Sequence, residues 1–169
     1  MQKLSGKTAL ITGGNSGIGL ATAQLFVEQG ARVAITGRDP ASLEQAQRSL
    51  GNDVLALRSD AGNVADITQL MSAVGEHFGQ LDVLFLNAAA GCPAPIEFTT
   101  EEQFDTMSGI SFKGVFFAIQ KAVPLMRPGA SIIVTTSISN QVGAPNFSVY
   151  AACKAAARSL VQSASLELA

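Results

Sequence analysis

The chain has 169 residues, of which 47% are hydrophobic and 14% are charged, and its net charge is −2. This length predicts one domain over residues 1–169 around a single core, and the low charge fraction excludes a disordered chain. The charge balance also argues against nucleic acid as a partner, because such a protein needs a basic face to neutralise phosphates.

No segment has the features of export or of membrane insertion. The first seven residues lead directly into a strand-like run, without the apolar stretch and cleavage site of a signal peptide. No apolar run reaches the roughly 18 residues of a membrane span. Cys92 and Cys153 lie outside any CxxC or metal-ligand spacing. We therefore expect a soluble, cytoplasmic protein with reduced thiols and no metal site, a bridge between the two cysteines being the alternative.

Short apolar runs alternate along the chain with longer segments of helical period. We expect strands at residues 8–12, 32–36, 54–59, 83–87 and 131–136. We expect helices at residues 17–29, 41–50, 64–78, 101–107, 110–126 and 148–168. This alternation is typical of βαβ units and predicts a Rossmann-type α/β fold, with a doubly wound parallel sheet between two layers of helices.

Two local signals mark the expected helix ends. Gly30 follows the first helix, where a residue in the left-handed conformation is expected. Thr99 and Glu102 have the spacing of a capping box at the start of the helix over 101–107.

Two of the expected helices have more apolar surface than one sheet face can bury. The helix over 110–126 is apolar around most of its circumference, which predicts burial on two sides. The helix over 148–168 is rich in alanine and permits close approach of another helix. Because exposed apolar patches mark interfaces, we expect these helices to join a homodimer or homotetramer. The alternative is a helix buried wholly within one chain.

A glycine-rich segment over residues 12–19 joins the first expected strand to the first helix. Gly13 permits a tight turn, Gly17 lets the backbone approach a pyrophosphate, and Gly19 allows close helix packing. The amide donors and the positive helix end then face the phosphates. The residues expected to hold a dinucleotide here are Gly13, Asn15, Ser16, Gly17, Ile18 and Gly19.

The second expected strand ends beside a cation. A site that prefers NAD usually places a carboxylate at this point, where it binds the adenosine ribose and repels a 2′-phosphate. This chain instead has Thr36 at the strand end, followed by Arg38, and a guanidinium suits a phosphate. We therefore expect NADP(H) in preference to NAD(H). The alternative is that Arg38 is only a solvated surface charge.

Tyr150, the only tyrosine, lies four residues before Lys154. On a helix this spacing places the phenol and the ammonium on one face. A free tyrosine has a pKa of about 10, which suits proton transfer near neutrality poorly, and a nearby cation favours the ionised form. Ser137 lies at the end of the last expected strand, where open α/β sheets place ligands. We expect Ser137 to hydrogen-bond a substrate oxygen while Tyr150 donates or removes its proton.

The TGxxxGxG spacing and the YxxxK pattern resemble the short-chain dehydrogenase/reductase family, classical type, over essentially the whole chain. The resemblance implies a catalytic set of Ser137, Tyr150 and Lys154. Tyr150 and Lys154 are also expected to contact the cofactor, with Lys154 binding the nicotinamide ribose and tuning the tyrosine.

The resemblance also implies further cofactor contacts. Asp60, followed by Ala61, is similar to the family aspartate at the adenine, although a turn or helix-start residue is the alternative for Asp60. Asn87 and Ala88 resemble the family's asparagine-alanine-glycine element, which supports the central sheet.

The chain departs from the family pattern at three places. Ser111 stands where the family has an asparagine that organises a proton-relay water, so we expect Ser111 as an altered member of the catalytic set. Ala89 replaces the glycine after Asn87 and Ala88. The chain stops at Ala169, whereas family members continue with further strands and a substrate-covering loop. We therefore expect an incomplete sheet and a chain shorter than the working protein.

These motifs favour hydride transfer between NADP(H) and a carbonyl or secondary alcohol of a small molecule, with the tyrosine as general acid and base. One alternative is a catalytically silent dinucleotide-binding protein that acts through partner contacts. A purely structural α/β domain is the other.

Overall fold

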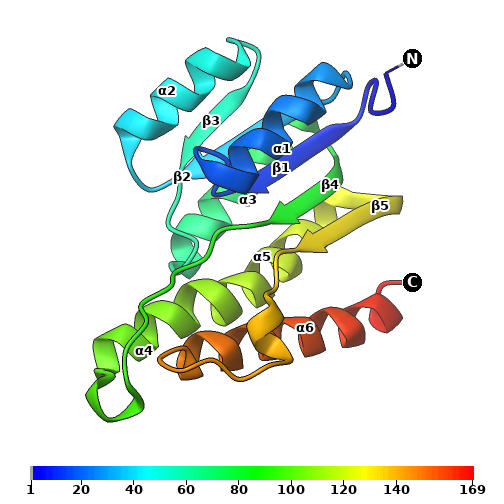
Figure 1. Cartoon of the computed structure of the whole chain (residues 1–169). Helices are drawn as coiled ribbons and strands as arrows, with labels where there is room; N and C mark the ends of the chain where they lie inside the picture. The colour runs from blue at the N-terminus through cyan, green and yellow to red at the C-terminus, as the bar shows by residue number, and fades with distance from the viewer. Residues whose placement is uncertain (1) are drawn as a thin grey trace.

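The computed structural model describes residues 2–169 and has one parallel sheet between two layers of helices (Figure 1). The strands are β1 (Thr8–Thr12), β2 (Arg32–Gly37), β3 (Leu55–Arg58), β4 (Leu81–Leu86) and β5 (Met126–Val134). The α-helices are α1 (Gly17–Glu28), α2 (Pro40–Leu50), α3 (Val64–Phe78), α4 (Glu101–Ser108), α5 (Gly114–Ala122) and α6 (Ser148–Glu167). The strand order β3-β2-β1-β4-β5 confirms the predicted Rossmann-type doubly wound fold.

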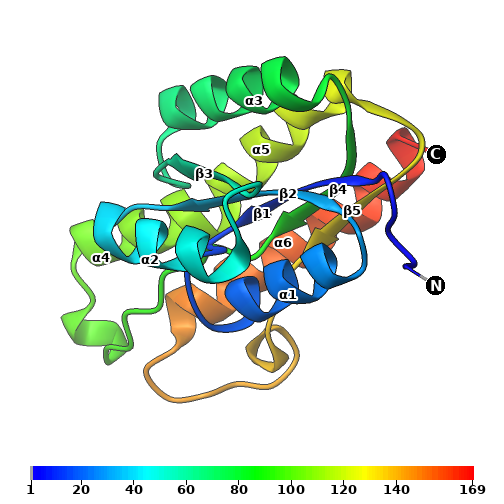
Figure 2. The ribbon, with the colours of Figure 1, turned by 90° about the horizontal axis from the view of Figure 1, so that it is seen from above.

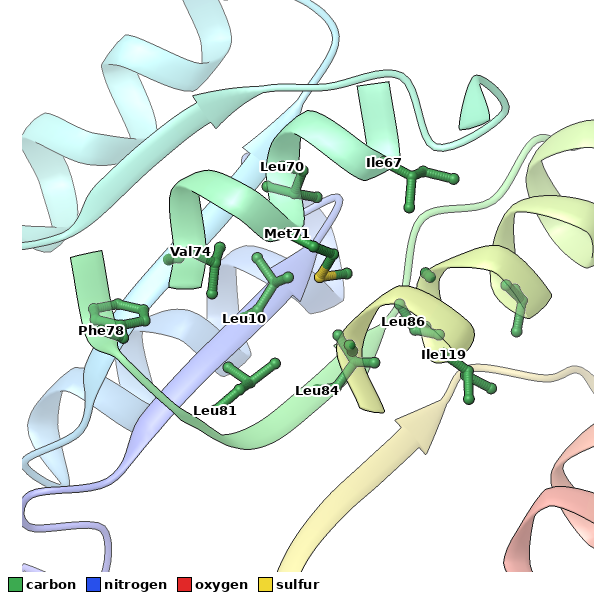
Figure 3. Packing of buried hydrophobic residues seen from close by; sticks show 14 residues of the cluster. Leu10, Ile67, Leu70, Met71, Val74, Phe78, Leu81, Leu84, Leu86 and Ile119 are labelled. Carbon is green, nitrogen blue, oxygen red and sulfur yellow. The ribbon is translucent and has the colours of Figure 1, made fainter. Parts of the chain in front are cut away.

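Both faces of the sheet are covered, with α1 and α2 on one side and α3, α5 and α6 on the other (Figure 2). Leu10 and Leu84 pack against Val74 of α3 in the core of the second side (Figure 3). Ile11 and Ile35 belong to the core on the first side. All of β1 is buried, as expected for a central parallel strand. Because the strands are parallel, their carboxyl ends meet at one edge of the sheet.

The chain between β4 and β5 differs most from the prediction. The two helices expected over 101–107 and 110–126 form one continuous run, in which α4 passes through a π-helical turn, η2 (Gly109–Lys113), into α5. Gly109 does not break this run, because a glycine inside a helix costs only about 1 kcal/mol. The helix ends early, at Ala122, and a 3-10 turn that contains Pro124 follows it, since proline cannot continue an α-helix.

Strand β5 begins earlier than predicted, at Met126, which pairs with Leu81. The pairing then shifts, and it becomes regular at Ser131, which pairs with Val83. Gly129, with φ of 91°, lies in the irregular stretch, which explains why the sequence pattern predicted a strand only from residue 131. The other predicted helices and strands agree with the structure to within two residues.

One of the two predicted helix-end signals is confirmed and the other is displaced. Gly30 has φ of 87°, the predicted left-handed conformation. The capping box of α4 lies at Thr100 and Gln103, one residue after the predicted Thr99 and Glu102. The hydroxyl of Thr99 instead donates a hydrogen bond of 3.1 Å to the carbonyl of Pro95, so it is engaged with the preceding turn.

Cys92 is exposed and Cys153 is buried, and both are free thiols. In the part of the chain that the structure describes, no helix combines the length and apolar character needed to cross a bilayer.

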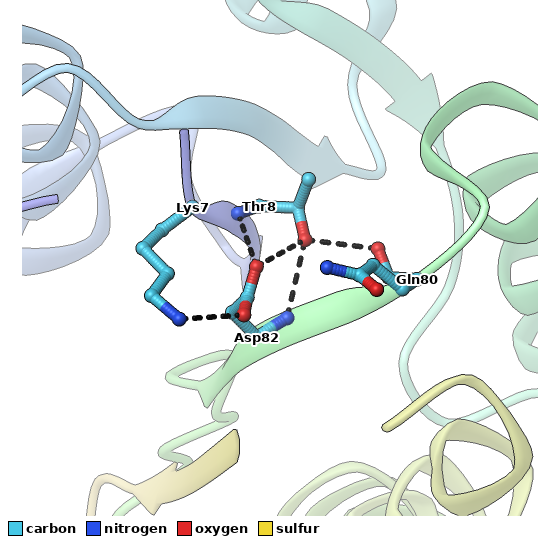
Figure 4. A network of polar contacts seen from close by, with 4 residues as sticks. All are labelled: Lys7, Thr8, Gln80 and Asp82. Carbon is cyan, nitrogen blue, oxygen red and sulfur yellow. Dashed lines mark hydrogen bonds and ion pairs between the residues drawn. The ribbon is translucent and has the colours of Figure 1, made fainter. Parts of the chain in front are cut away.

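A polar network joins the amino ends of β1 and β4, at the edge opposite to the strand carboxyl ends (Figure 4). The carboxylate of Asp82 accepts hydrogen bonds from the Thr8 amide at 2.9 Å and from the Lys7 ammonium at 3.0 Å. The Thr8 hydroxyl donates to the carbonyl of Gln80 at 2.9 Å. Burial opposes ionisation of Asp82, but these bonds and the Lys7 charge outweigh it, and the pKa of Asp82 is lowered.

Candidate active site

A groove of about 860 Å³ opens at the carboxyl ends of the strands. The candidate cofactor residues that line it are Gly13, Asn15, Ser16, Gly17, Ile18, Arg38, Asp60, Ala61, Asn87 and Ala88. Its volume is within the range of small-molecule and cofactor sites. The sequence-predicted cofactor residues from four separate loops are therefore brought together, whereas Gly19, Tyr150 and Lys154 do not line this groove.

The glycine loop has the conformation that its sequence requires. Gly13 and Gly17 have φ of 64° and 51°, in the left-handed region that favours glycine. Gly19 is buried under the loop, and a Cβ atom there would collide with the carbonyl oxygen of Gly13. The three glycines thus permit the turn and the close contact between the loop and α1.

The N-terminus of α1 is not capped by a side chain. Ser16 is its N-cap residue but makes no capping hydrogen bond, and the first turn has no acidic residue. The helices α2, α3 and α4, by contrast, are capped by Asp39, Asn63 and Thr100. Free amide groups at a helix N-terminus bind anions, so this end of α1 suits a phosphate group of a dinucleotide.

Gly37 and Arg38 lie at the end of β2, next to Arg58 of β3. A Cβ atom at Gly37 would lie 2.6 Å from the side chain of Asn15, which in turn donates a hydrogen bond of 2.9 Å to Ser42. Arg38 is exposed at the groove, and Arg58 donates from Nε to the Arg38 carbonyl at 3.2 Å. The backbone of Arg38 is therefore held by a contact from the neighbouring strand.

The nearest carboxylate to Arg38 in sequence, Asp39, is engaged elsewhere. Its Oδ2 accepts a hydrogen bond of 2.8 Å from the amide of Ser42, as the N-cap of α2. Hydrogen bonds from the Ser42 side chain and backbone lower the pKa of Asp39. The Asp39 carboxylate is therefore an ionised helix cap.

On the adenine side that the sequence predicted, Asp60 shapes its own loop. Its Oδ1 accepts from the amide of Gly62 at 2.8 Å, and its amide donates to Asp66 at 2.9 Å. Ser59 next to it is buried, and its hydroxyl has no hydrogen-bond partner among residues 2–169. Asp60 therefore has the turn-forming contacts of the alternative interpretation and also lines the groove.

Lys154 is almost completely buried, with 2% of its surface exposed. Its ammonium donates a hydrogen bond of 2.7 Å to the carbonyl of Thr135 and lies 5.7 Å from the ring centroid of Tyr150. Burial lowers the pKa of Lys154, although the neighbouring Cys153 acts in the opposite direction. The Tyr150 ring and the Lys154 ammonium thus lie near each other on α6, as their four-residue spacing predicts.

Asn87 connects this pair to the glycine loop. Its Oδ1 accepts from the hydroxyl of Thr135 at 3.2 Å, and its Nδ2 donates to the carbonyl of Gly13 at 3.4 Å. The amides of Asn87 and Ala88 both donate to the hydroxyl of Thr12 at 3.1 Å. A continuous set of hydrogen bonds therefore runs from the loop after β1, across β4, to the segment that holds Lys154.

Ser137 lies beyond the end of β5, as the N-cap of a short 3-10 turn, η4 (Ile138–Asn140). Its hydroxyl oxygen accepts a hydrogen bond of 3.1 Å from the amide of Ser139 and lies 3.1 Å from the Ser139 hydroxyl oxygen. The turn η4 packs against α6, which carries Tyr150. The structure therefore places all three members of the predicted Ser-Tyr-Lys set around one end of β5.

Comparisons with known proteins show the family of this chain. A family model described as short chain dehydrogenase matches residues 7–169. The chain belongs to the short-chain dehydrogenase family. It is 46% identical over 165 residues to the oxidoreductase asL5 of Sarocladium schorii, a match that covers 96% of this chain and 66% of that protein. It is 39% identical to the NADP-dependent (R)-specific alcohol dehydrogenase of Lentilactobacillus kefiri, over 99% of this chain and 68% of that protein.

Solved structures of this family superpose closely. A putative short-chain alcohol dehydrogenase from Sinorhizobium meliloti 1021 gives a TM-score of 0.92 at 31% identity, over 97% of this chain and 67% of that chain. A 3-ketoacyl-(acyl-carrier-protein) reductase from Brucella melitensis, complexed with NADH, gives 0.93 at 32% identity, over 98% and 72%. The chain spans about two thirds of the length of the curated relatives it matches.

Ser111, at the asparagine position of the short-chain dehydrogenase pattern, lies in the π-helical turn η2. It is fully buried, and its hydroxyl has no hydrogen-bond partner among the described residues. The turn packs against α6, and the adjacent Gly114 is so close to the loop after β3 that a Cβ atom would collide with the carbonyl of Ala61. π-helical turns are frequent at functional sites.

Sequence reasoning gave no role to four contributors to this site, among them Ser139, a competing serine whose spacing to Tyr150 does not fit the family pattern. Thr12 and Thr135 form hydrogen bonds with the Asn87 segment, Ser139 contacts Ser137, and Arg58 contacts Arg38. Only Thr12 carried a signal, because it opens the glycine-rich segment. The other three act through contacts across the sheet edge or within the turn after β5, which spacing along the chain does not reveal.

Proposed function

We propose that this chain is the nucleotide-binding and catalytic part of an oxidoreductase that moves a hydride between NADP(H) and a carbonyl or secondary alcohol. In this proposal, residues 1–169 form one dinucleotide-binding domain. The observation that carries the proposal is the buried Lys154 ammonium, which binds the Thr135 carbonyl at 2.7 Å and lies beside the Tyr150 ring. Through Asn87, the same segment is linked to the glycine loop.

The groove residues fit a dinucleotide. The uncapped N-terminus of α1 and the glycine loop offer backbone donors for the pyrophosphate. Asp60, Ala61, Asn87 and Ala88 all line the groove. In this proposal, Asp60 and Ala61 contact the adenine, and Asn87 and Ala88 lie toward the nicotinamide. When bound, the nicotinamide supplies the hydride in the reducing direction and accepts it in the oxidising direction.

The catalytic residues have separate tasks in this proposal. In reduction, Tyr150 gives its phenolic proton to the substrate oxygen as the substrate carbon gains the hydride, and solvent then returns a proton to the phenolate. Ser137 donates a hydrogen bond to the same oxygen. Lys154 binds the nicotinamide ribose and stabilises the phenolate through its positive charge. The buried hydroxyl of Ser111 has no hydrogen-bond partner among residues 2–169; in this proposal it holds a water molecule and so supplies protons to this group.

We further propose a preference for NADP(H). Arg38 offers a guanidinium at the groove, and the neighbouring Asp39 carboxylate is used as the cap of α2. A guanidinium binds a 2′-phosphate bidentately, and no competing carboxylate stands in the position of Gly37 or Arg38. The name of the NADP-dependent relative from Lentilactobacillus kefiri supports this choice.

Self-association through the helices on the α5 side is a further part of the proposal. Three phenylalanines of the α4–α5 run are about half exposed: Phe104 at 51%, Phe112 at 40% and Phe116 at 42%. Such a concentration of exposed aromatic surface favours an interface. A homodimer or homotetramer that uses this run together with α6 would bury these rings.

The proposed function is tested with the full-length protein that contains this chain. NADPH binding is followed by the change in its fluorescence, and NADPH oxidation is then measured with acetophenone, cyclohexanone and ethyl acetoacetate. We expect saturable binding of NADPH and oxidation with at least one ketone. Binding without oxidation by any ketone supports the catalytically silent alternative, and absence of dinucleotide binding contradicts both.

A further inference from the structure

The hydroxyl of Ser137 has one side-chain neighbour within hydrogen-bond distance among residues 2–169, the hydroxyl of Ser139 at 3.1 Å. The Ser139 amide donates to the same Ser137 oxygen at 3.1 Å. Both serines are partly buried, and the turn η4 holds them two residues apart. Ser139 thus contacts Ser137 through its backbone and through its side chain.

The role of the Ser139 hydroxyl depends on how many hydrogen bonds the Ser137 hydroxyl can form. A serine hydroxyl has one proton to donate and two lone pairs. The Ser139 amide occupies one lone pair of Ser137, which leaves one proton and one lone pair. Without a ligand, the Ser137 proton is directed to the Ser139 oxygen. When a substrate oxygen accepts that proton, the second lone pair of Ser137 becomes available to the Ser139 hydroxyl.

We propose that Ser139 is a positioning residue for the reaction, which reverses the direction of this hydrogen bond when substrate binds. The inference rests on the proposed function. Ser137 turns its proton to the substrate carbonyl oxygen, and the Ser139 hydroxyl rotates to donate to Ser137. The exchange requires only the rotation of two hydroxyl groups, with no movement of heavy atoms and no covalent change.

This arrangement strengthens the donor that faces the substrate. A hydroxyl that accepts two hydrogen bonds is a better donor, because linked hydrogen bonds polarise one another. The Ser139 amide also keeps the Ser137 oxygen in place on the turn, so the donor is preorganised for the developing charge on the substrate oxygen. Loss of the Ser139 hydroxyl leaves the amide contact intact and removes the second donor alone.

The test compares Ser139→Ala with Ser139→Thr in the full-length protein, using NADPH and whichever of the three ketones gives the highest kcat/KM. Because a neutral hydrogen bond contributes about 1 kcal/mol, we expect kcat to fall about fivefold to tenfold in Ser139→Ala. The Kd for NADPH should be unchanged, and Ser139→Thr, which keeps a hydroxyl, should restore kcat to within about twofold. Ser72→Ala removes an exposed hydroxyl that binds the Thr68 carbonyl, and this control should leave kcat unaltered.

A second measurement excludes a merely structural effect. In the Ser137→Ala background, Ser139→Ala should cause no further loss of residual kcat, because Ser139 acts through the Ser137 hydroxyl. Independent, multiplicative losses would overturn the inference, as would a normal kcat in Ser139→Ala.

Different results would contradict the proposed function and the role of Ser139. If Ser137→Ala and Tyr150→Phe are inactive while Ser139→Ala is normal, only the role of Ser139 is wrong. If the first two variants are fully active, or if the unaltered protein reduces none of the ketones, the proposed function is wrong and the role of Ser139 falls with it.

Discussion

The ammonium of Lys154 donates a hydrogen bond of 2.7 Å to the carbonyl oxygen of Thr135, from a position with 2% exposure. The bond joins the first half of α6 to the segment that leaves β5. We expect Lys154→Met to retain the fold, because methionine fills a similar apolar volume, and to lower kcat by at least about 100-fold, because the phenolate loses its cation. Circular dichroism checks the fold, and NADPH oxidation checks kcat. A kcat within about threefold of normal would contradict the role of Lys154.

The lowered pKa of Lys154 also has a consequence for stability. The pKa is lower in the folded chain than its ordinary value of 10.5 because burial disfavours the charged form. The unfolded chain therefore binds more protons in the window just below pH 10.5, so this lysine makes stability rise with pH there. Relative to Lys154→Met, the unaltered chain should gain unfolding free energy across that window. Urea unfolding at several pH values measures this, and a constant difference between the two proteins would contradict it.

Tyr150 is expected to be the proton donor and acceptor. Tyr150→Phe removes the phenolic oxygen and keeps the ring that lies 6.0 Å from the ring of Phe147. General acid-base catalysis contributes about 10²–10⁴-fold, so turnover should fall by a factor in that range while the Kd for NADPH stays within about twofold. Phe147→Leu, which changes the neighbouring ring only, is the matched control. A normal kcat in Tyr150→Phe would falsify the assignment.

Arg38 is expected to distinguish the two dinucleotides. A hydrogen-bonded charge pair contributes about 1.5–3 kcal/mol, so Arg38→Ala should raise the Kd for NADPH about 10- to 100-fold and leave the Kd for NADH within about threefold. Arg48→Ala serves as the control, because Arg48 pairs with Glu44 on the exposed side of α2. Equal losses for both cofactors would show that Arg38 does not contact a 2′-phosphate. Fluorescence titration provides both constants.

Gly19→Ala is expected to damage both stability and binding. The new methyl group would collide with the Gly13 carbonyl, and overpacking of this kind costs about 1–3 kcal/mol. The displaced loop should also bind NADPH more weakly. Gly91→Ala is a suitable control, because nothing lies within 4 Å of a Cβ atom there. Urea unfolding and NADPH titration test the pair, and equal behaviour of the two variants would exclude the predicted contact.

Asp82→Asn should lower stability without affecting the reaction, since the network lies at the opposite edge of the sheet from the groove. The pKa of Asp82 is lowered in the folded chain, so its contribution is present above the ordinary value of 3.8 and is lost as pH falls below it. We expect a loss of about 1–2 kcal/mol at pH 7, which shrinks below pH 4. Asp53→Asn, at an exposed position, is the control. A loss that is independent of pH would contradict the charge-based explanation.

The fold was largely predictable from the sequence because each strand and helix carries its own period and its own end signals. The buried run of β1 and the glycine turn after it are examples, since both depend on residues that are neighbours in the chain. The π-helical turn was not predictable in this way. Its extra residue is accommodated by packing against α6 and against the loop after β3, and neither contact leaves a mark in local periodicity.

The candidate site likewise contains residues that the sequence predicts and residues whose contacts follow only from the fold. Tyr150 and Lys154 belong to a short motif whose spacing predicts their proximity, and the structure places the Lys154 ammonium 5.7 Å from the centroid of the Tyr150 ring. The contacts of Thr135 and Ser139, by contrast, depend on how the chain turns after β5. A serine or threonine side chain suits many surroundings equally well, so its partners follow only from the folded backbone.

The π-helical turn η2 also changes which side chains share a side of the long α4–α5 run. Twelve residues of regular α-helix separate two positions by about 120° around the axis. One additional residue in the turn takes away about 100° of that. Phe104 and Phe116, which are 51% and 42% exposed, are therefore aligned to within roughly 20°. A regular helix with the same sequence would separate the two rings by about 120°, whereas deletion of one residue within η2 would leave eleven residues of regular helix between them and so should keep them aligned.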